Sequence, residues 1–248
     1  MPRVSVITPV YNPKESFWEI SRESILNQTS NDFEWIVVDD GSTEEKRFEY
    51  DILLERNYGP SVARNAGFNI SRGDIITYLD LGDELASDRI ENIIKLFDEF
   101  KIELLFSAYN IIQNGQPFRF DHFDYIGKHP NFPTAFEYIR ILQTQNISIP
   151  LGVAHKRTPF ILAGGFQRGI VCGEDGILWR RMVDRIASYQ IMFSDDLAGD
   201  YYITENGQSR TQRRFEMGGF AFDGSRNDNG KYLDEGWFKT FSSEGLYD

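Results

Sequence analysis

Residues 75–79, Ile-Ile-Thr-Tyr-Leu, constrain the fold most, because this β-branched and apolar run ends abruptly at a cluster of carboxylates. Such a run is typical of a strand that is buried on both faces in the middle of a parallel sheet. Open α/β sheets bind ligands beyond the carboxyl ends of their strands. Asp80 and Asp83 would then stand at the mouth of a cleft, where carboxylates suit a hard divalent cation and its phosphates. The competing interpretation is a solvated acidic turn, since Asp and Gly are common loop residues.

The strands and helices of the first half alternate, which predicts βαβ units and a mainly parallel sheet. A second apolar strand ends at Asp39 and Asp40, so both acidic loops should open on the same edge of the sheet. The predicted strands of this half are 4–10, 34–38, 52–54, 75–79 and 104–109, and the predicted helices are 14–28, 62–70 and 88–100.

The pattern weakens after residue 110. Asn114-Gly115 predicts a hairpin turn. Helices are expected near 135–143, 158–162 and 177–186, and strands near 148–155 and 197–203. Because the chain contains neither an internal repeat nor a linker, we expect one domain over residues 1–248.

The formal net charge of −12 argues against a nucleic-acid partner, which would require a basic face. An anionic small ligand is still compatible, because a local arginine cluster can outweigh the global charge. The single cysteine, Cys172, excludes an internal disulfide and favours a reducing, cytoplasmic location. Neither a signal peptide nor a membrane span of about 20 apolar residues is expected, which leaves peripheral association with the inner face of a membrane open. The absence of glycine-rich dinucleotide and Walker motifs disfavours oxidoreductases and nucleotide hydrolases.

Several segments, in this order and spacing, resemble the family 2 glycosyltransferases. They are residues 4–12, 28–29, 38–43 and 57–67, and more loosely 164–166, 174–175 and 179–180. The resemblance implies an α/β GT-A fold, with a central mostly parallel sheet flanked by helices. It also implies inverting transfer of a sugar from a nucleotide-diphosphate donor to a saccharide or lipid-linked acceptor. The halves would be a nucleotide-sugar-binding part at about 1–110 and an acceptor side at about 111–203, followed by a lid or tail at 204–248.

Five residues take roles from this resemblance. Pro9, Tyr11 and Asp39 would hold the nucleoside, with Asp39 accepting a hydrogen bond from a base N–H and Tyr11 supplying a flat face. Arg64 would face the donor pocket. Asn65 is expected to be structural, satisfying loop backbone groups.

The segment Asp80-Leu81-Gly82-Asp83 departs from the family, which usually carries Asp-x-Asp-Asp there and binds its metal through the second aspartate. The resemblance implies Mg²⁺ or Mn²⁺, with Asp80 and Asp83 as the ligands. Three alternatives are open. Gly82 permits unusual backbone angles that let Asp83 take the ligand position, the enzyme works without a metal, or the protein binds sugar nucleotides without turnover. Residues 202–206 also lack the histidine with which many relatives reach the metal.

Residues 208–214 form the densest basic run of this acidic chain. Arg213 and Arg214 would bind the donor diphosphate as part of a lid, because arginine forks suit phosphate oxygens and the leaving group develops negative charge. The competing interpretation is a solvated tail loop. The tail aromatics Trp237, Phe238 and Phe241 suggest docking onto the domain or onto a second subunit of a homo-oligomer.

Asp175 is the predicted general base, with Glu174 as the second choice. Its role would be to take the proton of the acceptor hydroxyl as the oxygen attacks the anomeric carbon. The competing interpretation is an acidic helix start that acts only as a cap. Two further functions remain open: a sugar-nucleotide-binding protein without transferase activity, and a nucleotidyltransferase on a related sheet.

Overall fold

The computed structural model describes residues 1–43, 48–113, 115–120, 148–170 and 173–203. Within them, nine strands form one sheet. Their bounds are β1 Val4–Val10, β2 Phe33–Asp39, β3 Ile52–Leu53, β4 Ile75–Tyr78, β5 Glu84–Leu85, β6 Leu104–Gln113, β7 Gln116–Phe120, β8 Val153–Lys156 and β9 Ile191–Tyr202. The order across the sheet is β3-β2-β1-β4-β8-β6-β9-β5, and β7 pairs with β6.

The sheet is parallel through β3-β2-β1-β4, as the sequence predicts, and mixed beyond β4. Val10 of β1 lies opposite Asp39 of β2, and Ile7 lies opposite Tyr78 of β4. The carboxyl ends of these three strands therefore lie side by side. β8 runs antiparallel to both β4 and β6, whereas β9 runs parallel to β6. The hairpin predicted at residues 114–115 is confirmed by the antiparallel β6–β7 pair.

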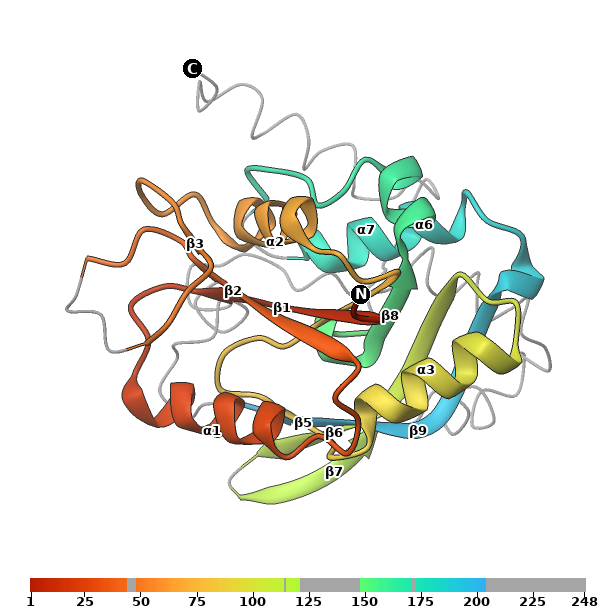
Figure 1. Ribbon diagram of the computed structural model, residues 1–248, viewed down its shortest axis with the longest axis horizontal. Coiled ribbons are helices and arrows are strands. Elements are labelled where there is room, and N and C mark those ends of the chain that lie inside the picture. The colour runs from red at the N-terminus through yellow and green to blue at the C-terminus, as the bar shows by residue number, and fades with distance from the viewer. Residues whose placement is uncertain (44–47, 114, 121–147, 171–172, 204–248) are drawn as a thin grey trace, which may run out of the picture.

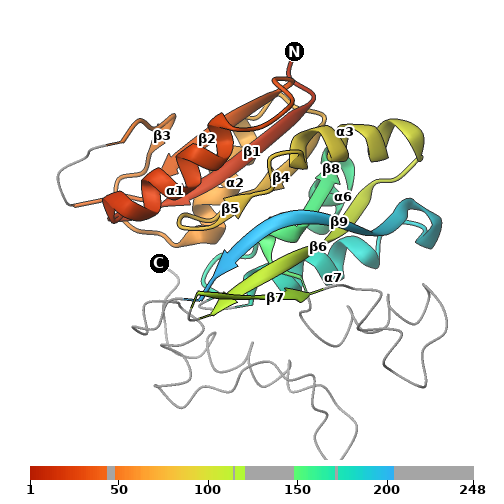
Figure 2. The ribbon, with the colours of Figure 1, turned by 90° about the horizontal axis from the view of Figure 1, so that it is seen from below.

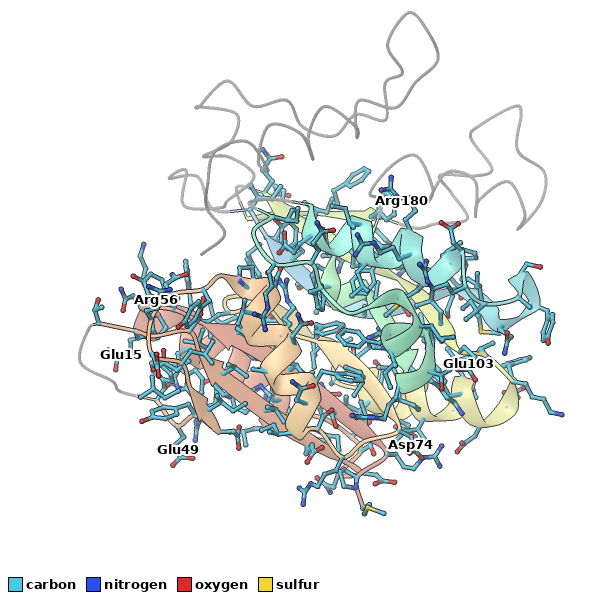
Figure 3. The ribbon with its side chains drawn as sticks, turned by 90° about the horizontal axis from the view of Figure 1, so that it is seen from above. Glu15, Glu49, Arg56, Asp74, Glu103 and Arg180 are labelled. Atoms are coloured by element: carbon cyan, nitrogen blue, oxygen red, sulfur yellow. The ribbon has the colours of Figure 1, made fainter. Side chains whose placement is uncertain are left out.

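Helices cover both faces of the sheet. Their bounds are α1 Glu15–Leu26, α2 Pro60–Ile70, α3 Arg89–Glu99, α6 Arg157–Ala163 and α7 Glu174–Val183, with short 3-10 turns at Pro150–Gly152 and Ser188–Gln190. α2, α6 and α7 lie on one side and α1 and α3 on the other (Figure 1). Figure 2 shows α1 and α3 in front of β1, β2 and β4, and Figure 3 looks onto the opposite side. No helix among these described residues is long and apolar enough to cross a membrane.

Side chains alternate between two cores, as the period of a strand requires. Ile75 packs with Val6 under α1 and α3, whereas Ile76 packs with Ile7 under α2, α6 and α7. Both isoleucines of β4 are completely buried. This confirms that the 75–79 run is buried on both faces, where each large aliphatic side chain stabilises the fold by about 1.5–3 kcal/mol.

Four strands differ from the prediction. β6 runs to residue 113 rather than 109, and β8 starts at residue 153 rather than 148, because residues 150–152 form a 3-10 turn. β9 starts at residue 191 rather than 197. The sequence did not indicate this early start, because register shifts against β6 interrupt the alternation of side chains along β9. At that point the Ser194 hydroxyl donates to Asp196 Oδ2, and the Asp196 N–H donates to Ser194 Oγ. β5 is only two residues long and gives no periodic signal. It pairs with β9 at Gly199, where a Cβ atom would lie 1.9 Å from the Glu84 carbonyl oxygen, so glycine is required. The predicted helix at 135–143 lies outside the described residues, as do Cys172, the arginine lid and the tail aromatics.

Candidate functional site

The loops that follow β1 and β2 are tied together at the carboxyl edge of the sheet. The Asn12 backbone N–H donates to Ser42 Oγ at 2.9 Å, and the Thr43 N–H donates to Asn12 Oδ1 at 2.8 Å. Pro9 lies on β1 opposite Val38, and Tyr11 follows β1 with 46% of its surface exposed. β2 and β4 both run parallel to β1, so the acidic loops that follow them open on this same edge, as expected. The exposed aromatic ring of Tyr11 stands there too.

Asp39 and Asp40 have different surroundings. Asp39 is buried at the end of β2, where its Oδ1 accepts the Ser42 N–H at 2.8 Å. Asp40 accepts the N–H groups of Tyr58 and Gly59 at 2.8 and 2.7 Å, so it holds the turn that leads into α2. Asp40 is thus structural, while Asp39 remains the candidate for the nucleoside.

The centre of the site is a buried guanidinium. Arg64 of α2 donates from Nη2 to both carboxylate oxygens of Asp80 at 2.7 Å, and from Nη1 to Glu174 Oε1 at 3.0 Å. Its guanidinium carbon lies 5.2 Å from the centre of the Phe166 ring, and the residue is only 3% exposed. Burial alone would lower the pKa of Arg64, but the carboxylates of Asp80 and Glu174 outweigh burial and raise it. Arg64 therefore remains charged, and it connects the Asp80 turn after β4 to the start of α7 at Glu174.

The Asp80 side chain keeps 36% of its surface exposed, whereas Asp83 is 6% exposed. Asp83 Oδ1 accepts the backbone N–H of Tyr202 at 3.2 Å. Burial, assisted by the neighbouring Asp80, raises the pKa of Asp83 well above its usual range. The turn between the two aspartates thus directs Asp83 inward against β9, and only Asp80 faces solvent.

Gly82 sets the geometry of this turn. It has a φ of +96°, and its N–H donates to Ser21 Oγ at 2.9 Å. The Ser21 hydroxyl in turn donates to the Asp83 carbonyl at 3.0 Å. The unusual backbone angle expected at Gly82 is present, but it does not bring Asp83 forward as a ligand.

The turn after β4 offers a divalent cation a single exposed carboxylate, that of Asp80. The described residues contain no group of three or more His, Cys, Asp or Glu side chains that could hold a metal by themselves. Asp80 fits a cation such as Mg²⁺, which protein sites hold through one or two carboxylates together with substrate phosphates. The expectation of Asp83 as the second ligand finds no support, because Asp83 is buried and its Oδ1 accepts the backbone N–H of Tyr202 in β9.

α7 begins at residue 174, three residues earlier than predicted, after Gly173 with a φ of +83°. Glu174 lies in its first turn with a side chain only 9% exposed, and its carboxylate is engaged by Arg64. Asp175 is half-buried, and its Oδ1 accepts the Gly176 N–H at 2.8 Å. Its charge contributes to the raised pKa of both Arg64 and Tyr109, so it lies near both. Of the two carboxylates, Asp175 is the more accessible.

Asn65 has the structural role that was expected. Its Nδ2 donates to the Phe166 carbonyl at 2.8 Å, and the Phe166 N–H donates back to its Oδ1 at 3.0 Å. Ser21 and the Tyr202 N–H shape the site but were missed from sequence, since no local pattern links residues so far apart in the chain. Phe166 lies in a segment that carries the resemblance, but its contacts with Asn65 and Arg64 were not predicted. The predicted ligands Arg213 and Arg214 lie outside the described residues.

Comparison with known proteins identifies the family and the fold. Residues 5–157 match the family model described as "Glycosyl transferase family 2". A Rickettsia felis glycosyltransferase of uncharacterised activity is 34% identical over 191 residues, covering 71% of this chain and 29% of that protein. The crystal structure of S. aureus TarS gives a TM-score of 0.62 at 22% identity, covering 82% of this chain and 60% of that one. A mannosyltransferase of Pyrobaculum calidifontis, PcManGT, gives 0.59 at 17% identity, covering 87% and 62%.

The structural likenesses establish the fold, which is the GT-A fold that the sequence predicts. The chain spans less than a third of the length of its Rickettsia relatives. The family model covers more than half of the 248 residues and includes β1, β2, α2 and the Asp80 turn. The chain therefore belongs to glycosyl transferase family 2.

Proposed function

We propose that this chain transfers a sugar from a nucleotide-diphosphate donor to a saccharide or lipid-linked acceptor, with inversion at the anomeric carbon. The observation that carries this proposal is the convergence of Asp80 and the Glu174-Asp175 pair on one buried arginine, Arg64. Asp80, which follows β4 on the proposed donor side, and Glu174, which opens α7 on the proposed acceptor side, both accept hydrogen bonds from the Arg64 guanidinium. Such a convergence suits a reaction that joins two substrates, because positioning both reactants lowers the entropic part of the barrier.

The nucleoside would bind across the tips of β1 and β2, at Pro9, Tyr11 and Asp39. Asp39 would accept a hydrogen bond from a base N–H, and Tyr11 would pack on a flat face of the nucleoside. The titles of the neighbouring structures name complexes of TarS with UDP-GlcNAc and of PcManGT with GDP-Man and Mn²⁺. A nucleotide-diphosphate sugar is the donor class that this likeness supports.

A cation would be needed to balance the charge of the site. One guanidinium, Arg64, faces the carboxylates of Asp80, Glu174 and Asp175, so the site is net negative before the anionic diphosphate enters. Mg²⁺ or Mn²⁺ at Asp80 would supply electrostatic stabilisation of the diphosphate. Arg213 and Arg214 are proposed to add arginine forks from the C-terminal segment.

Asp175 would act as the general base. It takes the proton of the acceptor hydroxyl while the oxygen forms the new bond to the anomeric carbon. The bond from that carbon to the diphosphate oxygen breaks, and its electron pair leaves with the nucleoside diphosphate. Attack from the face opposite the leaving group inverts the configuration. Glu174 is less suited to this role, since Arg64 already engages its carboxylate.

The test measures nucleoside diphosphate release from a panel of UDP- and GDP-sugars, with Mn²⁺, with Mg²⁺ and with a chelator. Wild type should release nucleotide, and Asp175→Asn should lose release while still binding donor. Asp184→Asn, at the exposed far end of the same helix, is the matched control and should behave as wild type. Donor binding without release from any sugar nucleotide under any of these conditions would instead favour a binding protein without turnover.

A further inference from the structure

A groove that is separate from the donor edge opens between α2, α6 and α7. Its volume is about 600 Å³, within the range of about 300–1,000 Å³ that ligand pockets occupy. Asn65 and Phe166 line the groove, whereas Arg64, Asp80 and Glu174 do not. The Phe166 ring also lies 5.2 Å from the Arg64 guanidinium carbon, so it stands between the groove and the Arg64 cluster. α2, α6 and α7 all lie on the same side of the sheet, the side seen in Figure 3.

The floor of the groove is apolar and firmly packed. Phe68 of α2 and Phe160 of α6 stack with ring centroids 4.0 Å apart, and Phe166 lies edge-on to Phe160. All three are nearly buried, so they give the groove a fixed base. Ile161 of α6, which is 63% exposed, gives the groove an apolar edge, and its neighbour Leu162 is 54% exposed beside it.

The polar lining consists of arginines and amides, namely Asn65, Asn69, Gln167, Arg168 and Arg181. No carboxylate is among the described residues that line the groove. Arg181 is half-buried, and its Nη2 donates to Gln167 Oε1 at 2.6 Å. Burial first, and then the positive charges of Arg185 and Arg180, lower the pKa of Arg181. A concentration of positive charge at one place in a chain of net charge −12 attracts an anion.

We propose that this groove binds a phosphate group, carried by a ligand distinct from the sugar-nucleotide donor. A phosphate suits this lining better than a carboxylate. One arginine can occupy both oxygens of a carboxylate through a bidentate pair of hydrogen bonds, whereas a phosphate has enough oxygens to accept from two arginines and from further amide donors. Arg168 and Arg181 supply the forks, and Asn69 and Gln167 supply the amides. The phosphate belongs either to a soluble phosphorylated saccharide, whose ring covers the aromatic floor, or to a lipid headgroup, whose chain meets Ile161 and Leu162.

The test follows the arginine side-chain Nε–H signals of ¹⁵N-arginine-labelled protein by NMR, with inorganic phosphate and glycerol 3-phosphate as probes. UDP or GDP, whichever of the two binds to the protein, is present at saturating concentration throughout. It occupies the proposed nucleotide site at the sheet edge, so that the probes cannot bind there. We expect the signals of Arg168 and Arg181 to shift with millimolar or tighter affinity, and the signal of Arg22 on α1 to stay in place. The proposal is overturned if neither groove signal shifts, or if Arg168→Gln/Arg181→Gln protein binds the probes as tightly as wild type.

The variants guard against loss of folding. Arg168 is exposed, so Arg168→Gln alone should leave the unfolding midpoint unchanged and weaken phosphate binding at least threefold. The double variant should weaken binding at least tenfold. Arg22→Gln, an exposed arginine on the opposite face of the sheet, removes the same charge and should weaken binding less than twofold. An equal loss in Arg22→Gln would overturn the groove as the site.

Vesicles separate the two sources of phosphate. Flotation with phosphatidylglycerol vesicles, against phosphatidylcholine vesicles, tests the headgroup. Binding to the anionic vesicles that is lost in the double variant and reduced by Ile161→Ser supports the groove and assigns a lipid. Probe-induced shifts without vesicle binding support the groove and assign a soluble phosphorylated ligand. Vesicle binding that survives the double variant, with no probe shifts, overturns the proposal.

Discussion

Nη1 of Arg64 lies 3.0 Å from Oε1 of Glu174, although 110 residues separate the two in the sequence. The first residue belongs to α2, which lies between β3 and β4 in the chain, and the second opens α7, which follows β8. A single guanidinium thus fixes the position of α7 relative to Asp80. Because Glu174 precedes Asp175, the same contact positions the proposed base.

Loss of the Arg64 charge should destabilise the protein strongly. Arg64→Met leaves Asp80 and the buried Glu174 without their partner, and removing one partner from a buried pair costs roughly 3–5 kcal/mol. Urea unfolding, followed by circular dichroism, measures the change. Arg22→Met removes one partner of the exposed Arg22–Glu19 pair and should cost less than about 1 kcal/mol. Equal losses in the two variants would show that the buried network adds no stability.

Replacement of the proposed base should separate catalysis from binding. Asp175→Asn should lower the rate of transfer by about 10²–10⁴-fold, the usual contribution of a positioned base, with nearly unchanged donor affinity. Glu174→Gln should instead lower the unfolding midpoint, since it weakens the contact with Arg64. Initial rates, calorimetric titration of donor and thermal unfolding distinguish the two variants. A fully active Asp175→Asn protein would assign the base to another residue.

The C-terminal arginines should contribute to donor affinity. Arg213→Ala and Arg214→Ala should each weaken donor binding by well over the roughly 0.5 kcal/mol typical of surface substitutions, because arginine forks on phosphate are charge-assisted. Calorimetric titration with the nucleoside diphosphate measures the effect, and Arg22→Ala is the charge-matched control. Affinities equal to that of wild type would remove the lid hypothesis.

Much of the donor side could be predicted from sequence because its information is local. One parallel strand ends at Asp39 and another two residues before Asp80, which places both carboxylates on one edge, and the residues around Asn65 carry the family pattern. The contacts of Glu174 and Asp83 could not be predicted in this way. Arg64 and the Tyr202 N–H meet them from 110 and 119 positions away, and no periodicity encodes such pairings. The early start of β9 was hidden for a related reason, since a register shift breaks the alternation from which strands are recognised.

The buried Tyr78–His155 pair should make stability depend on pH. The Tyr78 hydroxyl lies 2.8 Å from His155 Nε2, and His155 Nδ1 lies 2.8 Å from the Lys156 carbonyl, to which it donates. Nε2 therefore accepts the tyrosine proton, and the imidazole is neutral. Burial lowers the pKa of His155 from 6.5 to about 4.

The direction of the change in stability with pH follows from the number of protons that each state binds. Between pH 6.5 and 4 the unfolded chain binds a proton at this histidine that the folded chain does not, so stability falls as the pH falls. The contribution is complete above pH 6.5, and roughly 3 kcal/mol is lost by pH 4. Urea unfolding at pH 7 and pH 5 should show a smaller difference for His155→Gln, which can keep both hydrogen bonds but does not titrate. An identical pH dependence in the variant would exclude His155 as the cause.

The two aspartates of the turn should respond differently to cation removal. Asp80 is half-exposed and is the proposed ligand, so Asp80→Asn should abolish the part of donor affinity that Mn²⁺ or Mg²⁺ adds to wild type. Asp83→Asn should retain that part, because Asp83 is buried against the Tyr202 N–H and a neutral amide can accept the same hydrogen bond. Donor titrations with Mn²⁺ and with a chelator, on both variants, measure the difference. Loss of the cation effect in Asp83→Asn at an unchanged unfolding midpoint would show that Asp83 turns outward to the metal when donor binds.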